Sequence, residues 1–288
     1  MQIQWYPGHM AKARRQLIEQ LRRVDAVVEL CDARLPRSSR NPDLDALCAG
    51  KRRALVLNKS DLADPAATSA WISKAQAGGV DAVAFDALKG KAREALGAIE
   101  RASSRAYERA AARGINKTIR VMVVGVPNVG KSAFINKLSG RAAAKTADRP
   151  GVTRAAQWVR VADRLELLDT PGLLWPKIDD REASRRLAYL GTIRDEILDQ
   201  ESLAEDLLRE LMDVSPDAVR ARFRIAPDAG REGNMDSEPS PRGSLLEAVC
   251  AGRGYILSGG RLDTARGAAA ALDEFRAGKL GRITLERA

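Results

Sequence analysis

The chain has 288 residues, of which 45% are hydrophobic, so it can bury a sizeable core as one large domain or two ordinary ones, and global disorder is excluded. Its three cysteines form no Cys-x-x-Cys pair and its single histidine cannot build a histidine-rich metal site, so neither a disulfide framework nor a zinc site is expected. The net charge of +10 favours a polyanionic partner such as nucleic acid, although it also suits a solvated surface.

The first part of the chain alternates between predicted strands and helices. Residues 9–23 have the spacing of a basic amphipathic helix. Short apolar runs then predict strands, and segments with helical periodicity lie between them. The strands are expected at 26–31, 54–57, 80–85, 120–124, 157–161 and 165–168, and the helices at 66–77, 91–113 and 131–139. This alternation indicates a mostly parallel α/β sheet.

The pattern changes at about residue 178, after which no strand is predicted. Helical periodicity covers 181–212, 215–223, 244–252 and 262–277, and the Pro- and Gly-rich residues 227–243 predict a loop. We therefore expect an α/β domain with the basic helix over 1–178 and an all-helical domain over 179–288. The N-terminus lacks the apolar stretch of a signal peptide, and no segment approaches 18 consecutive apolar residues, so we expect a cytoplasmic protein without a membrane span.

Residues 125–132, GVPNVGKS, match the pattern G-x-x-x-x-G-K-S between a predicted strand and a predicted helix. Gly125 and Gly130 let the backbone bend around phosphate oxygens, and the N–H groups at the helix start point at the anion. We expect Lys131 to reach the β- and γ-phosphates and the Ser132 hydroxyl to ligate Mg²⁺. A glycine-rich turn without a ligand is the less favoured alternative.

Two short segments follow the phosphate loop in the order that such a site needs. Asp169 begins the sequence Asp-Thr-Pro-Gly at the end of a predicted strand and suits a place beside Mg²⁺, and the Gly172 N–H suits the γ-phosphate. Thr153 ends the sequence Arg-Pro-Gly-Val-Thr and can ligate Mg²⁺ only when the γ-phosphate is present. Each segment alone is weak, but their order and spacing after a phosphate loop make a strong prediction.

Residues 58–61, Asn-Lys-Ser-Asp, predict a guanine-reading loop after a buried strand. The Asp61 carboxylate can accept both N1–H and N2–H of guanine, a pair that adenine lacks, and such sites reject the wrong analogue by roughly 10⁴–10⁵. Asn58 would support the loop and the stem of Lys59 would pack on the base. This motif precedes the phosphate loop, whereas in ordinary small GTPases it follows D-x-x-G. The order indicates a circular permutation in which the helix at 91–113 joins the original termini.

Together these motifs resemble the circularly permuted bacterial GTPases of the ribosome biogenesis GTPase A family, over nearly the whole chain. The resemblance also rests on WYPGHM at 5–10, DARLP at 32–36 followed by Asn41-Pro42, and DEFRAGKLGR at 273–282. It implies a GTPase that acts late in large ribosomal subunit assembly, binds ribosomal RNA and contacts RNA with its C-terminal helical domain. A GTP-dependent switch acting only on protein partners, without ribosome binding, is the alternative.

The sequence departs from other GTPases at two positions. Leu173 follows Gly172 where many GTPases place a glutamine that orients the attacking water, so we expect slow intrinsic hydrolysis or a catalytic group from elsewhere. The resemblance points to His9 for that role, with packing or RNA contact as the equal alternative. Asp86 replaces the small hydroxyl residue expected in the second base-contacting motif, at FDALKG over 85–90.

The resemblance further makes Asn128 of the phosphate loop a candidate potassium ligand beside the phosphates. The expected catalytic residues are His9, Lys131 and Thr153. The residues expected at the nucleotide are Asn58, Lys59, Asp61, Asp86, Ala87, Asn128, Val129, Gly130, Lys131, Ser132, Ala133 and Gly172. Those expected at Mg²⁺ are Ser132, Thr153 and Asp169.

Overall fold

The computed structural model describes residues 15–140, 156–172, 180–193, 198–226 and 244–288. The chain divides into two compact units, one of residues 1–193 with 286–288 and one of residues 194–285. The boundary expected after residue 178 therefore falls before the division in the structure, because residues 180–193 belong to the first unit. No helix of the described part is long and apolar enough to cross a membrane.

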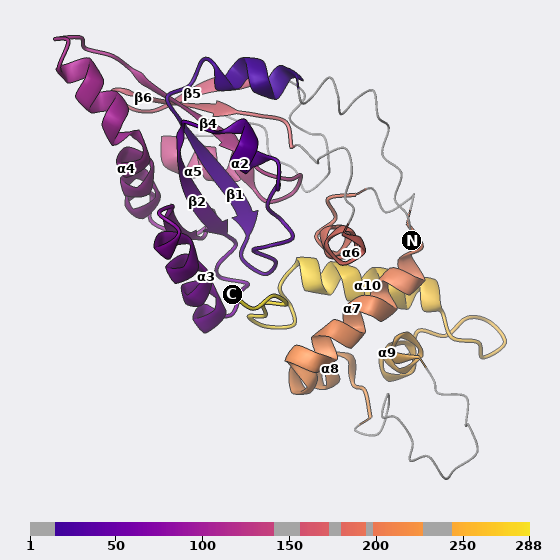
Figure 1. The fold of residues 1–288 in the computed structure, drawn as a ribbon. Coiled ribbons are helices and arrows are strands. Elements are labelled where there is room, and N and C mark those ends of the chain that lie inside the picture. Colours follow the sequence, from indigo (N-terminus) through magenta and orange to yellow (C-terminus); the bar gives the residue numbers. More distant parts are fainter. Residues whose placement is uncertain (1–14, 141–155, 173–179, 194–197, 227–243) are drawn as a thin grey trace. The chain divides into compact units, whose positions relative to one another are not determined.

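The first unit is built on a six-stranded sheet in the order β3-β2-β1-β4-β6-β5 (Figure 1). All neighbouring pairs are parallel except β5 with β6. The strands are β1 Ala26–Asp32, β2 Arg52–Asn58, β3 Asp81–Phe85, β4 Ile119–Val124, β5 Gln157–Ala162 and β6 Leu165–Asp169. β1 is buried along its whole length, as expected for a central strand covered on both faces, whereas β5 lies at the edge and is partly exposed. The predicted mostly parallel α/β sheet is confirmed.

Helices cover both faces of this sheet. α4 and α5 pack with one set of alternating strand residues, which includes Val28 and Leu30 of β1. On the other face, Val27 packs with Leu17 and Leu21 of a helical turn at 15–21, and Cys31 packs in the cluster that Trp71 of α3 borders. The alternation follows from the period of two along a strand. Besides the helical residues 15–21, the described part of this unit contains α2 Leu44–Leu47, α3 Pro65–Ala77, α4 Ala92–Ala111, α5 Lys131–Ser139 and α6 Arg181–Tyr189.

The second unit contains only helices and loops among its described residues, apart from an isolated bridge between Ile256 and Leu262. Its helices are α7 Gln200–Val214, α8 Pro216–Phe223, α9 Leu245–Arg253 and α10 Thr264–Arg276. Leucines of α7 and the aromatic rings of α8 and α10 are buried, and Glu274 pairs with both Arg222 and Arg253. The helical C-terminal part is therefore confirmed.

The single helix expected over 181–212 is wrong. α6 ends at Tyr189, and α7 begins at Gln200. Between them Gly191 has a φ of +66°, a left-handed conformation that glycine adopts at little cost and that ends the helix. The helical spacing of apolar residues continues across this break, so the sequence pattern alone hides it.

Candidate functional site

The predicted motifs meet at one edge of the sheet, because each follows the carboxyl end of a parallel strand. Residues 32–36 follow β1, residues 58–61 end β2, the loop starting at Asp86 follows β3, residues 125–132 follow β4, and Asp169 ends β6. The carboxyl ends of parallel strands form the usual ligand-binding edge of an α/β sheet. Segments separated by more than a hundred residues are thus brought together.

The phosphate loop has a backbone that only glycine fits at two points. Gly130 has a φ of +92°, and a Cβ there would lie 2.6 Å from the Asn58 side-chain nitrogen. A Cβ on Gly125 would lie 2.5 Å from the Leu30 carbonyl oxygen. α5 begins directly after Gly130 at Lys131, so its N-terminal N–H groups face the loop. The loop therefore has the conformation that an anion-binding turn requires.

Lys131 lies buried inside this loop. Its Nζ donates to the carbonyl oxygens of Gly125 at 3.0 Å and Val126 at 2.9 Å. Burial lowers the pKa of Lys131 to about 8, although the charge of Asp169 acts in the opposite direction. The ammonium group is therefore withdrawn from water and held by neutral carbonyl oxygens and the nearby charge of Asp169. A phosphate in the loop would add the negative charge that stabilises its protonated form.

Ser132 and Asp169 provide oxygen atoms that suit Mg²⁺. The Ser132 hydroxyl donates to Asp169 Oδ2 at 2.9 Å, while Asp169 Oδ1 is buried and has no hydrogen-bond partner among the described residues. Burial raises the pKa of Asp169, and the Ser132 hydrogen bond and the Lys131 charge oppose that shift. Within the described ranges no three His, Cys, Asp or Glu side chains cluster as a metal site. The arrangement therefore fits Mg²⁺, which protein sites hold through one or two oxygens together with phosphates and water.

The base-reading loop is tied directly to the phosphate loop. Asn58 Nδ2 donates to the Val129 carbonyl oxygen at 2.7 Å, and Lys59 Nζ donates to the Asn128 carbonyl oxygen at 2.7 Å. Lys59 itself has a left-handed backbone with a φ of +57°. Asp61 is exposed at this edge. Asn58 and Lys59 therefore each connect residues 58–61 to the phosphate loop.

Asp86 forms a turn at the end of β3. Its Oδ1 accepts hydrogen bonds from the N–H groups of Leu88 at 2.7 Å and Lys89 at 3.0 Å. Gly90 donates to the Asp86 carbonyl oxygen at 2.7 Å, and a Cβ on Gly90 would lie 2.4 Å from that oxygen. The carboxylate thus performs the loop-shaping hydrogen bonding that a small hydroxyl can also perform, and Ala87 lies within this turn.

A buried ion pair that the sequence pattern did not predict lies next to the base-reading loop. Arg34 binds the Asp32 carboxylate with Nε at 2.9 Å and Nη2 at 2.8 Å, and Lys59 Nζ lies 3.2 Å from the same group. Burial alone would raise the pKa of Asp32, but the charges of Arg34 and Lys59 hold it well below its usual range. The sequence signal for this pair is DARLP at 32–36, which places an acid and a base two residues apart directly after a buried strand.

The phosphate loop also contacts the chain segment after α6. Asn128 has a left-handed φ of +62°, and its Nδ2 donates to the Gly191 carbonyl oxygen at 2.5 Å. Gly172 also lies close to the loop, because a Cβ on it would lie 2.7 Å from Pro127 Cα. His9, Thr153 and Leu173 lie outside the described residues.

Proteins similar in sequence to this chain are consistent with a nucleotide site at this edge of the sheet. The chain is 42% identical over 289 residues to ribosome biogenesis GTPase A of Priestia megaterium, covering 99% of this chain and 97% of that protein. It is 30% identical to the protein of the same name from Thermotoga maritima, covering 99% of this chain and 94% of that protein. The chain belongs to the ribosome biogenesis GTPase A family. It is accordingly a GTPase, which hydrolyses GTP.

Two structures show the same fold as this member of the ribosome biogenesis GTPase A family. GNP-bound YlqF from T. maritima has a TM-score of 0.67 and 26% identity, and covers 96% of this chain and 98% of that chain. The GDP-bound structure of TM YlqF has a TM-score of 0.67 and 25% identity, and covers 94% and 98%. The family described as "50S ribosome-binding GTPase" matches residues 120–218. That match begins at β4, so the base-reading loop lies upstream of it, as the permuted order requires.

Proposed function

We propose that this chain binds GTP across the loops at 58–61, 125–132 and 169–172 and uses its hydrolysis in a late step of large ribosomal subunit assembly. The observation that carries the proposal is the pair of hydrogen bonds from Asn58 and Lys59 to the carbonyls of Val129 and Asn128. They join the base-reading loop to the phosphate loop, so one rigid group of residues can recognise both ends of a nucleotide. The names of the relatives supply the ribosomal role.

In this proposal each loop has a separate task. Asp61 reads guanine, with the stem of Lys59 on the base and Ala87 at its side. The N–H groups from Val129 to Ala133 and the Lys131 ammonium group bind the phosphates. Ser132 and Thr153 hold Mg²⁺, with Asp169 orienting the Ser132 hydroxyl. The metal, when bound, neutralises charge on the phosphate oxygens. The Gly172 N–H faces the γ-phosphate.

Hydrolysis in this proposal depends on groups outside the common set. Leu173 cannot orient water, so His9 or a group from the ribosomal particle does so, and basal turnover is slow. Asn128 uses Nδ2 for its bond to Gly191, so its side-chain oxygen can serve as a potassium ligand. Equal turnover in potassium and sodium would exclude the ion, and full subunit-stimulated turnover of His9→Ala would exclude the histidine.

The proposal places the protein in the cytoplasm, bound to a large-subunit precursor through ribosomal RNA. It is tested by pelleting the full chain with isolated large subunits in the presence of a non-hydrolysable GTP analogue, GDP or no nucleotide. We expect co-sedimentation that is strongest with the analogue and weakens as salt is raised. A chain that binds GTP but does not pellet in any nucleotide state would instead support a switch acting on protein partners.

Asp61→Asn is the matched variant for this experiment. Its affinity for guanine nucleotides should fall roughly 10³-fold or more. Its affinity for the corresponding xanthine nucleotides should rise, because the amide now complements the xanthine edge. Pelleting that returns with the xanthosine triphosphate analogue shows that the nucleotide in this site controls attachment. Unchanged preference for GTP would remove Asp61 from the base pocket.

A further inference from the structure

A basic groove lies at the edge of the sheet opposite the nucleotide motifs. It has a volume of about 380 Å³ and lies between the segments that lead into β1, β2 and β4 and the C-terminal half of α4. β1 and β2 each have seven residues, so the two edges are about 20 Å apart. The basic side chains that line the groove are Lys51, Arg52, Arg105, Arg109, Arg113 and Lys117. A ligand here does not compete with a nucleotide.

Most of this positive charge is not neutralised by the protein. Lys117 pairs with Asp25, and Lys51 donates to the Val24 carbonyl oxygen at 2.5 Å. Arg52 and the three arginines of the groove wall are exposed and form no ion pair within the described part of the chain. Asp25 is the acidic residue in the described lining. Unpaired guanidinium groups gathered around one concave surface create a field that attracts an anion.

The spacing of the arginines indicates the size of that anion. Arg105 and Arg109 lie four residues apart on α4, so their Cα atoms are about 6 Å apart along the helix, and Arg113 follows in the turn after α4 ends at Ala111. A single phosphate group cannot contact all three. Ile115, which is 53% exposed, lies in the same lining and provides apolar contact beside the charges. The groove therefore fits an extended polyanion that carries apolar groups as well as charges.

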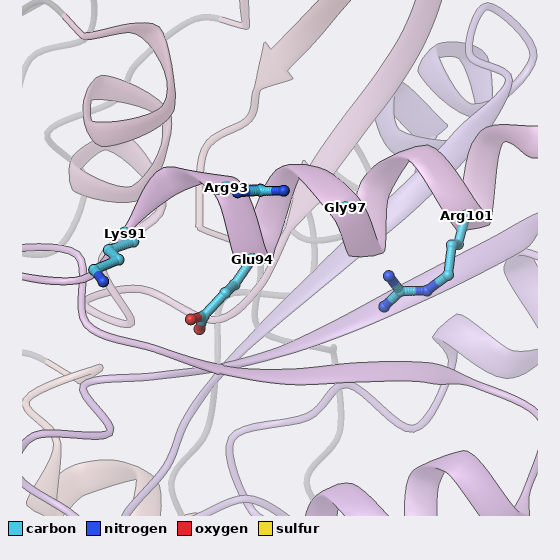
Figure 2. Close-up of a pocket in the computed structure, with 5 residues that line it drawn as sticks. All are labelled: Lys91, Arg93, Glu94, Gly97 and Arg101. Atoms are coloured by element: carbon cyan, nitrogen blue, oxygen red, sulfur yellow. The ribbon is translucent and has the colours of Figure 1, made fainter.

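A second groove on the N-terminal half of α4 is less suited to an anion. It has a volume of about 410 Å³ and is lined by Lys91, Arg93, Glu94, Gly97 and Arg101. In Figure 2 the carboxylate of Glu94 extends between Lys91 and Arg101, and Arg101 pairs with Asp81. Its positive charge is thus partly neutralised, and the C-terminal half of α4 is the stronger anion site.

We propose that the groove between α4 and the leading ends of β1, β2 and β4 binds the phosphate backbone of RNA. This proposal rests on the ribosomal role proposed above and gives the first unit an RNA contact of its own. Arginine binds phosphate oxygens with two parallel N–H groups, and Ile115 can contact a ribose or base. RNA provides both partners along one strand, whereas an acidic peptide provides carboxylates on flexible side chains.

The test compares two double variants of the full chain that lose the same charge. Arg105→Gln/Arg109→Gln removes two groove arginines, and Lys74→Gln/Arg160→Gln removes two exposed cations elsewhere on the first unit. Binding of a fluorescein-labelled 20-nucleotide oligouridine is followed by fluorescence anisotropy from 50 to 300 mM KCl. We expect the RNA affinity of the groove variant to fall about tenfold or more. The slope of log K against log salt should become shallower by about 1.4, because two phosphate contacts are lost and each contributes ~0.7 on single-stranded RNA.

The control variant should keep wild-type RNA affinity, and both variants should keep wild-type GTP affinity and basal hydrolysis. Equal RNA affinity of the two variants would overturn the proposal. Polyglutamate that displaces the RNA at equal charge concentration would also overturn it and assign the groove to an acidic protein. Pelleting with large subunits separates the two proposals: failure of the wild type contradicts the ribosomal role, whereas wild-type pelleting with an unaffected groove variant contradicts the groove alone.

Discussion

Replacing Arg34 with Met should destabilise the first unit far more than a surface substitution. The side chain is 2% exposed and Asp32 is fully buried, so methionine keeps most of the apolar stem but leaves a buried carboxylate. The lost contacts include the hydrogen bonds to Asp32 from Nε at 2.9 Å and Nη2 at 2.8 Å. Breaking a buried pair on one side costs about 3–5 kcal/mol. Because Lys59 remains 3.2 Å from Asp32, we expect about 3 kcal/mol.

Urea unfolding followed by tryptophan fluorescence measures this loss. All four tryptophans lie in residues 1–193, so the signal reports on the first unit. With a slope of ~3 kcal/mol per molar, the midpoint should fall by about 1 M at pH 7. The double variant Asp32→Asn/Arg34→Met should recover part of the loss, because no charge is left buried.

The effect of Arg34→Met on stability should also depend on pH. In the wild type the lowered pKa of Asp32 contributes stability that is present above its unfolded value of ~3.9 and is lost as pH falls below it. In Arg34→Met the pKa of Asp32 in the folded state rises, so Asp32 takes up a proton at a higher pH and no longer leaves a buried charge. The loss of unfolding free energy relative to the wild type should therefore shrink between pH 7 and pH 4. A deficit below about 1 kcal/mol at pH 7, or one that grows as pH falls, would refute the reasoning.

Three further predictions concern the phosphate loop and the end of the chain. Because the pKa of Lys131 is about 8, GTP affinity should fall about tenfold from pH 7 to pH 9, with proton uptake seen by calorimetry in two buffers. Gly130→Ala should lower GTP affinity at least ~10-fold, since its Cβ meets Asn58, whereas Gly140→Ala has the strained φ without a clash. Glu286→Gln should cost about 1.5–3 kcal/mol in urea unfolding, because charged hydrogen bonds become neutral.

The predictions for Lys131, Gly130 and Glu286 can each be contradicted by a specific result. Binding of GTP without proton uptake at pH 8.5 would mean that Lys131 is already fully protonated in the free chain. Equal GTP affinity of the two glycine variants would show that the approach of Asn58 does not determine the loop. A Glu286→Gln chain as stable as an exposed control such as Glu100→Gln would show that the carboxylate charge contributes nothing.

The strands and the phosphate loop were predictable because local pattern determines them. β1 and β4 are apolar runs that end at a polar residue or a glycine, and the loop from Gly125 to Ser132 needs its residue types at fixed spacing. The same kind of fixed spacing predicts the guanine-reading loop at 58–61. Its link to Asn128 through Lys59 was not predicted, since that contact joins positions 69 residues apart.

What the sequence did not reveal depends on tertiary contacts. Arg34 looks like an ordinary loop arginine, and its burial follows only from the packing around Asp32. Gly191 ends α6 within a segment whose apolar period continues, so the break was hidden. Glu286 accepts hydrogen bonds from the N–H groups of Arg37 at 2.6 Å and Ser38 at 3.1 Å, about 250 residues away in the chain, and no local pattern announces such a pair.

Glu286 has a consequence for how the protein can be dissected. The helical unit leaves the first unit after Ile193, and the chain returns to it at Glu286, whose carboxylate also pairs with Arg186 at 3.5 Å. The helical unit is therefore an insertion, held at both ends, and not an appended tail. Truncation after residue 193 removes a buried piece of the first unit along with the helices. The GTPase unit is complete only when residues 286–288 are kept together with residues 1–193.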